Sequence, residues 1–436
     1  MGLATRGLGK ALPRIHTVGM RPTENKGTAP GSFTAHGGLS TGGYAELKRR
    51  FHTPGATFGY NRADSPELGE FPRRNDFRLS AARLDAATQA GDVIDSVYLQ
   101  GGREAAIVAS AELAAKPPRW IDMARVRRGQ EVGRRYFTCL AISLGNLSLI
   151  GGFGASKINR VLVKGSRLSM ASEGRGYDPL PRLVETTVWL LHVLRGAEPG
   201  TLGHEKTLEV RALHAMIRQH LLERDWDVEA LDFPINQEQM LATLIGFGYN
   251  GVWGLRLMGV RLTRDEEEDF IHLWSYVGHL LGIDEDLLPR SYEDARAITL
   301  QILPRLLDPD EGTREIIENL HQRREANIGL PRVVQESMCR FFLPGTYADA
   351  LGLPGNVLVD WVVSGAYRTL GGGFSLWASF RPGDLERWEM DRVSRRLEEL
   401  LEKIRQGETG TPRPPARSVR AMFRSARSIS QALLSV

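Results

Sequence analysis

The stretch TRDEEEDFIHLWSYVGHLL, residues 263–281, is the clearest helix in the sequence. Thr263 and Glu266 stand at the spacing of a capping box, which closes a helix N-terminus, and Gly282 supplies the usual stop signal. Apolar residues recur at steps of three and four along the same stretch: Phe270, Leu273, Trp274, Val277, Leu280 and Leu281. One face of this helix is therefore expected to lie in a hydrophobic core.

Helical periodicity continues outward from this segment in both directions. Asn236 is expected to cap a helix over 237–258, and Asp284 is expected to open another. Further helical segments fall at 104–115, 122–148, 157–170, 180–194, 205–224, 291–307, 311–327, 331–343 and 385–405. Alternation typical of a strand is scarce, and 357–363 is its best candidate. The sequence predicts an all-α protein in which residues 79–405 form a single large helical domain.

The composition is that of a globular chain. Of 436 residues, 42% are hydrophobic and 25% charged. Cys139 and Cys339 are too far apart for a CxxC motif, and two cysteines cannot build a zinc cage or a disulfide framework. No apolar run approaches the roughly 18 residues that a bilayer span needs. We expect a reducing, cytoplasmic location, qualified only by the membrane contact considered below for the C-terminal segment.

The ends of the chain differ from its body in composition and charge. Residues 1–78 are rich in Gly, Pro, Ser and Thr, which indicates a largely irregular or disordered arm. Residues 1–50 carry a net charge of +6 and those after Glu408 carry +5, so the remainder carries −7 of the total of +4. An acidic body is the opposite of what binding to a phosphate backbone requires, and no nucleic-acid partner is expected.

The last segment, residues 406–436, joins a Pro/Arg linker to a basic amphipathic helix. Four arginines at steps of three and four would share one face of that helix: Arg417, Arg420, Arg424 and Arg427. Such a helix can lie on an anionic leaflet, so peripheral membrane contact through 416–436 is one hypothesis. A disordered basic tail, or docking on the acidic body, fits the same residues.

Common nucleotide and hydrolase motifs are missing. The glycines at 151, 152 and 154 precede Lys157 without the order of a phosphate-binding loop, and no strand pattern comes before them. Neither a GxSxG elbow nor an HExxH motif occurs.

His214 has the most suggestive surroundings of the ten histidines. It lies in LEVRALHAMIR, residues 208–218, with the small Ala212 and Ala215 beside it and Arg211 and Arg218 at i−3 and i+4. An imidazole among apolar residues, with cations nearby for carboxylates, suits a b-type haem. A core histidine on an amphipathic helix with two solvated arginines fits the same spacing, and the spacing does not decide between them.

A second polar face lies on the segment 180–194. Arg182, Glu185, Thr186 and Trp189 occur at i, i+3, i+4 and i+7 and would share one side of a helix. Beside a haem these residues would contact bound oxygen and transfer a proton, whereas facing water Arg182 and Glu185 would form an ordinary surface ion pair.

Several short segments carry a family resemblance from Gly91 to Pro354. In order they are GD at 91, WID at 120, RG at 128, RLVETT at 182, VRALHAMIR at 210, PINQE at 234, WSYVGHLLG at 274 and ADALGLP at 348. Together they resemble the latex clearing proteins, or rubber oxygenases, and the related MpaB-type oxygenases of the mycophenolic acid pathway.

The resemblance implies a globin-like helical core that binds haem b, with His214 as the axial iron ligand and Arg182 and Thr186 on the opposite side. It implies dioxygen and an apolar, isoprenoid-like molecule or polymer as substrates, with oxidative cleavage of a C=C bond. Rubber-cleaving members carry a lysine where this chain has Glu185, which is here the candidate acid/base. A non-catalytic haem protein that binds dioxygen, and a haem-free helical module for lipids or proteins, remain the alternatives.

Overall fold

The computed structural model describes residues 79–115, 117–166 and 180–378, together with positions 392, 395 and 399. The predicted N-terminal arm, the C-terminal segment 406–436 and nearly all of the predicted helix 385–405 lie outside these residues. No strand occurs in the described part of the chain, so the all-α prediction is confirmed.

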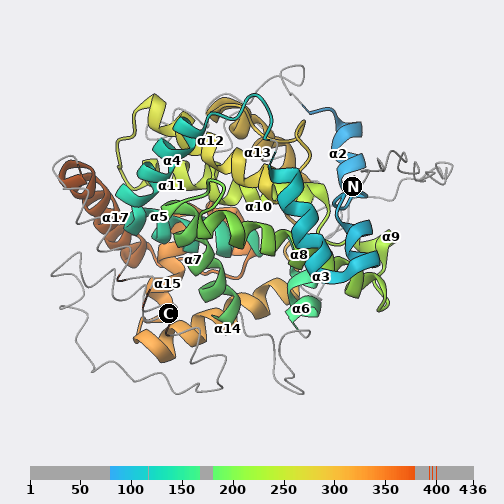
Figure 1. Ribbon diagram of the computed structural model, residues 1–436. Helices are drawn as coiled ribbons and strands as arrows, with labels where there is room; N and C mark the ends of the chain where they lie inside the picture. Colours follow the sequence, from blue (N-terminus) through green and yellow to red (C-terminus); the bar gives the residue numbers. More distant parts are fainter. Residues whose placement is uncertain are drawn as a thin grey trace, which may run out of the picture.

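The described residues are arranged as a succession of helices (Figure 1). Their bounds are α2 Ala81–Ala87, α3 Asp95–Ala114, α4 Met123–Arg135, α5 Phe137–Ser143, the π-helix η3 Leu144–Ile150, α6 Ser156–Ser166, α7 Leu180–Arg195, α8 Leu202–Leu222, α9 Val228–Leu231, α10 Gln237–Phe247, α11 Tyr249–Leu257, α12 Arg264–Leu280, α13 Tyr292–Leu306, α14 Glu311–Ile328, α15 Arg332–Phe342, α16 Gly345–Ala350 and α17 Val357–Ala378.

Helix α12 lies at the centre of the fold, as its sequence predicts. Thr263 and Glu266 form the expected capping box, and Phe270, Trp274 and Val277 are buried in a hydrophobic core to which residues from Leu79 to Phe374 contribute. Helix α4 lies alongside α12 (Figure 1). The two backbones approach closely because Gly129 has no side chain: a Cβ there would lie 2.3 Å from the carbonyl oxygen of Asp269.

Several expectations from the sequence need correction. The helix predicted over 237–258 is broken at Gly248, whose non-helical backbone separates α10 from α11. Asp284 opens no helix. Its carboxylate and that of Asp286 each accept a hydrogen bond from Arg83 at 2.6 Å, so the Asp284 carboxylate binds a side chain instead of capping a helix. The strand candidate 357–363 is the first part of α17, where the Asn356 side chain accepts from the Val359 amide at 3.1 Å.

The helix predicted over 122–148 is divided as well. Tyr136 has φ −107° and ψ 21°, which separates α4 from α5, and the last part of the segment is the π-helix η3. Among the described residues, no helix is both long and apolar enough to cross a membrane. The end of the domain at residue 405 remains a prediction.

The joint between α4 and α12 contains a titratable group. The His272 ring accepts a hydrogen bond through Nε2 from the amide of Asp122, the N-cap of α4, at 2.9 Å. That nitrogen must keep its lone pair, so the imidazole is neutral. Burial, with the positive charge of Arg125, lowers the pKa of His272 from 6.5 to about 4.

We therefore expect acid to destabilise the fold through His272. The unfolded chain binds a proton below about pH 6.5 and the folded chain only below about pH 4, so the free energy of unfolding falls as pH drops through this window, by up to about 1.4 kcal/mol per pH unit. His272→Gln keeps an acceptor but cannot titrate. Urea unfolding between pH 7 and pH 4 should show a shallower decline for the variant, and parallel curves would contradict this account.

Candidate active site

Helices α7 and α8 form an antiparallel hairpin that is tight at one end. Gly203 on α8 permits the contact, because a Cβ there would lie 2.1 Å from the carbonyl oxygen of Gly196 and 2.4 Å from that of His192. Further along the hairpin, Trp189 Nε1 donates to Thr207 Oγ1 at 3.0 Å. These contacts fix the register of the two helices.

The same register places Arg182 opposite His214. On α8, Thr207 and His214 are seven residues apart and share the stripe that faces α7. The nearness of Arg182 is visible in the electrostatics: burial, followed by the charges of Arg218 and Arg182, lowers the pKa of His214 from 6.5 to about 3. His214 is therefore a neutral imidazole, and its Nδ1 is buried without a hydrogen-bond partner among the described residues.

The polar residues expected on α7 lie together on that helix. Arg182 Nη1 is 3.4 Å from Glu185 Oε2, and the two side chains are 37% and 40% exposed, so the pair is a weak, hydrated one. Thr186, one residue further on, is exposed towards a cavity that adjoins α7. The structure thus brings Arg182 near His214 and places Thr186 at the edge of the cavity.

Arg211 and Arg218 lie beside His214 but are occupied. Arg211 Nε and Nη2 donate to the two carboxylate oxygens of Asp92, both at 2.7 Å, and Arg218 binds Asp95 at 2.7 Å. Both guanidinium groups are buried, and these salt bridges attach α8 to the start of α3, which lies next to it (Figure 1). Their expected contact with cofactor carboxylates stays a prediction. Asp92 and Asp95 were not recognised as their partners from the sequence.

The attachment of α8 should be costly to break. Asp92→Ala leaves Arg211 buried without its anion, and removal of one partner of a buried pair typically costs about 3–5 kcal/mol. Glu209→Ala serves as the control. It removes the partly exposed Lys206–Glu209 pair on the same helix and should cost under about 1 kcal/mol. Chemical denaturation of both variants tests this; similar losses in the two would refute a special role for Asp92.

A cavity of about 730 Å³ lies along the face of α7 that carries Leu183, Thr187 and Leu190. Its wall is mainly apolar and is contributed by α5, η3, α6, α7, α10, α11, α13, α14, α15, α16 and α17. Helix α7 contributes Leu183, Thr186, Thr187 and Leu190. A volume of this size is in the range of small-molecule binding sites. No pattern in the sequence indicated this cavity, because its wall is assembled from segments far apart in the chain.

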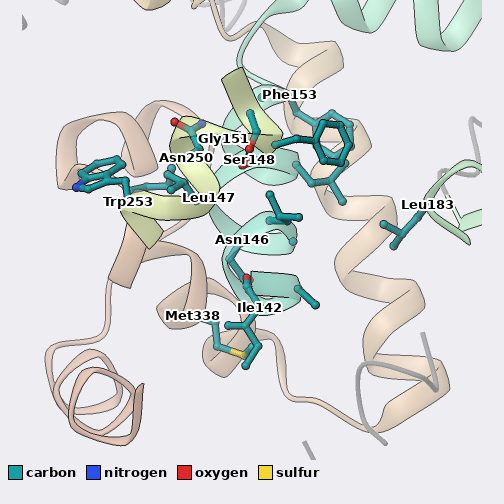
Figure 2. Close-up of a pocket in the computed structure, with 18 of the residues that line it drawn as sticks. Ile142, Asn146, Leu147, Ser148, Gly151, Phe153, Leu183, Asn250, Trp253 and Met338 are labelled. Atoms are coloured by element: carbon teal, nitrogen blue, oxygen red, sulfur yellow. Dashed lines mark hydrogen bonds between the residues drawn. The ribbon is translucent and has the colours of Figure 1, made fainter. Parts of the chain in front are cut away.

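The π-helix η3 forms a central part of the wall. Figure 2 shows Asn146, Leu147 and Ser148 of η3 between Trp253 on one side and Leu183 of α7 on the other. Ser148 Oγ donates to the Gly246 carbonyl at 2.6 Å, and Asn146 Nδ2 donates to the Ile142 carbonyl at 2.8 Å, so both polar side chains are satisfied by backbone. Short π-helices occur frequently at functional sites.

Comparisons with known proteins agree with this architecture. The family described as "ER-bound oxygenase mpaB/B'/Rubber oxygenase, catalytic domain" matches residues 144–373. The chain is 25% identical over 347 residues to the rubber oxygenase of Streptomyces sp. (strain K30), with 78% of each chain covered. Among solved structures it is similar to latex clearing protein LCP in its closed state, with a TM-score of 0.58 and 18% identity over 80% of this chain and 91% of that one.

The structural similarity to LCP establishes a shared fold, and the family match adds the enzyme class. The matched segment contains α7, α8, η3 and most of the cavity wall. Since it covers more than half of the chain, the protein belongs to the MpaB/rubber oxygenase family of oxygenase catalytic domains.

Proposed function

We propose that this protein is a haem b-dependent oxygenase that cleaves a C=C bond of an apolar, isoprenoid-like molecule oxidatively, giving carbonyl products. The proposal rests on the apolar cavity, because its wall includes α7, the helix that faces His214. The similarity to a protein named rubber oxygenase supports dioxygen and an unsaturated hydrocarbon as substrates.

The properties of His214 fit an axial iron ligand. A ligating histidine must be neutral, and the lowered pKa of His214 keeps it so at physiological pH. Its Nδ1 is buried and has no hydrogen-bond partner. In the described part of the chain, no group of three or more His, Cys, Asp or Glu side chains is arranged to hold a bare metal ion, and a haem requires only one such ligand. Haem b would supply the iron at which dioxygen is activated.

The residues of α7 then have separate tasks. Thr186 touches the cavity and is placed to orient the reacting end of a substrate by hydrogen bonding. Glu185 is the carboxylate on the Arg182 face and is our candidate for moving a proton, with Arg182 holding it in position from 3.4 Å. The apolar wall excludes water from the reacting double bond.

Arg211 and Arg218 support this site by fixing α8. Their salt bridges to Asp92 and Asp95 hold the helix that carries His214. In this proposal the two arginines act on the cofactor by positioning His214 and not by direct contact. By the resemblance, Glu185 stands where the rubber-cleaving members have a lysine, which argues against rubber itself as the substrate. The membrane contact proposed for 416–436 concerns residues outside the described part of the chain.

Replacement of His214 tests the ligand assignment. Purified His214→Ala should lack stoichiometric haem while its helical circular dichroism stays close to that of the unmodified protein. His220→Ala, on the same helix and outside the stripe that faces α7, is the matched control and should retain haem. Full haem occupancy in His214→Ala would overturn the assignment.

Two substitutions on α7 test the proposed roles in turnover. Thr186→Ala and Glu185→Gln should keep haem and lower the rate of oxygen-dependent substrate loss, by about 100-fold where a proton transfer is removed. The control is Thr187→Ala, because the Thr187 hydroxyl also lines the cavity but donates to the Leu183 carbonyl at 2.7 Å. Unchanged rates in both test variants would leave Arg182 and Glu185 as an ordinary surface ion pair.

A further inference from the structure

The cavity wall contains one buried cation without a counter-ion. Arg324, on α14, is only 8% exposed and lines the cavity. Its Nε is buried with no hydrogen-bond acceptor, and no carboxylate in the described part of the chain is paired with its guanidinium. Burial lowers the pKa of Arg324, and the groups that act against this effect are the Cys339 thiol and the Tyr367 hydroxyl rather than a carboxylate.

Such an arrangement is unusual within this protein. The other deeply buried arginines, Arg211 and Arg218, are each matched by a carboxylate at 2.7 Å. A buried charge without a partner costs several kcal/mol of folding free energy unless something else supplies the opposite charge. The buried charge of Arg324 therefore requires an anionic partner that the described residues do not supply.

A second unpartnered donor belongs to the same wall. Tyr367, on α17, lines the cavity, and its hydroxyl is buried without a hydrogen-bond partner. The charge of Arg324 acts on this hydroxyl, which places the two groups near each other. Asn146 does not satisfy either of them, because its Nδ2 donates to the Ile142 carbonyl and its Oδ1 accepts from Cys339 Sγ at 3.4 Å.

We propose that Arg324 and Tyr367 form a carboxylate-binding subsite in the cavity, so that the molecule bound there is a long unsaturated chain with a carboxylate at one end. A guanidinium binds a carboxylate through parallel N–H donors, and a phenol hydroxyl can donate a further hydrogen bond. The rest of the wall is apolar and suits the hydrocarbon chain. A neutral hydrocarbon would leave both donors unpaired.

This inference rests on the proposed function in taking the cavity as the substrate site, and it refines the substrate class. The carboxylate is held on α14 and α17, whereas Thr186 lies on α7, so the anchor and the residue assigned to the reacting end belong to different parts of one wall. Anchoring one end of a chain would select which double bond reaches α7.

The test compares binding of oleate with binding of oleyl alcohol, which has the same chain without the charge. In titrations of the full-length protein at pH 7, below the micelle-forming concentrations of the ligands, oleate should bind at least about tenfold more tightly than the alcohol, the preference expected of a charge-assisted hydrogen-bonded pair. Arg324→Met should remove this preference, and Tyr367→Phe should reduce it.

The matched control is Arg323→Met, which removes an equal charge from the adjacent exposed position of α14 and should keep the preference. Because Arg324 has no ionic partner among the described residues, the ligand-free Arg324→Met protein should unfold at a midpoint equal to or above that of the unmodified chain.

Equal binding of acid and alcohol by the unmodified protein would overturn the proposal, as would a preference retained in Arg324→Met. A clearly lowered midpoint in Arg324→Met would also contradict it, because the cation would then have a structural partner. These binding measurements do not need turnover. An acid preference in a protein that takes up no haem would refute the proposed oxygenase function alone, and haem-dependent turnover without an acid preference would refute the subsite alone.

Discussion

The buried ion pair between Arg211 and Asp92 holds the helix on which the proposed site depends. The side chain of Asp92 is 1% exposed and accepts two hydrogen bonds from Arg211. Seven residues further along α8, Arg218 binds Asp95 in the same way. Two fixed points seven residues apart define both the position and the rotation of α8. His214 lies between them, so its direction towards α7 is a consequence of these pairs.

Helix α7 connects the two halves of the site. One of its faces packs on α8 through Trp189 and places Arg182 opposite His214, while another lines the apolar cavity with Leu183 and Leu190. Thr186 lies where these faces meet. If the proposed function holds, the two faces of α7 would keep a polar, oxygen-activating region and a dry substrate region next to each other without mixing, as chemistry on an apolar double bond requires.

Local patterns in the sequence predicted much of the fold. The capping box at Thr263, the α7 and α8 segments and the stripe containing His214 follow from helical spacing alone, because those features depend on residues within one or two turns. Features that depend on distant partners were not predictable in this way. The pairing of Arg211 with Asp92 joins residues 119 positions apart, and the strand-like segment 357–363 became helix through a local cap at Asn356. The role of Arg324 could not be predicted from the sequence either, because whether a cation is paired depends on residues that are distant from it in the chain.

An absorption spectrum tests most directly the proposal that His214 anchors a haem beside an apolar cavity. Full-length protein, purified and then titrated with haem b, should develop a Soret band that saturates at about one haem per chain and shifts on reduction and exposure to dioxygen. A purified protein without a Soret band, and with no saturable gain on haem addition, would contradict the account.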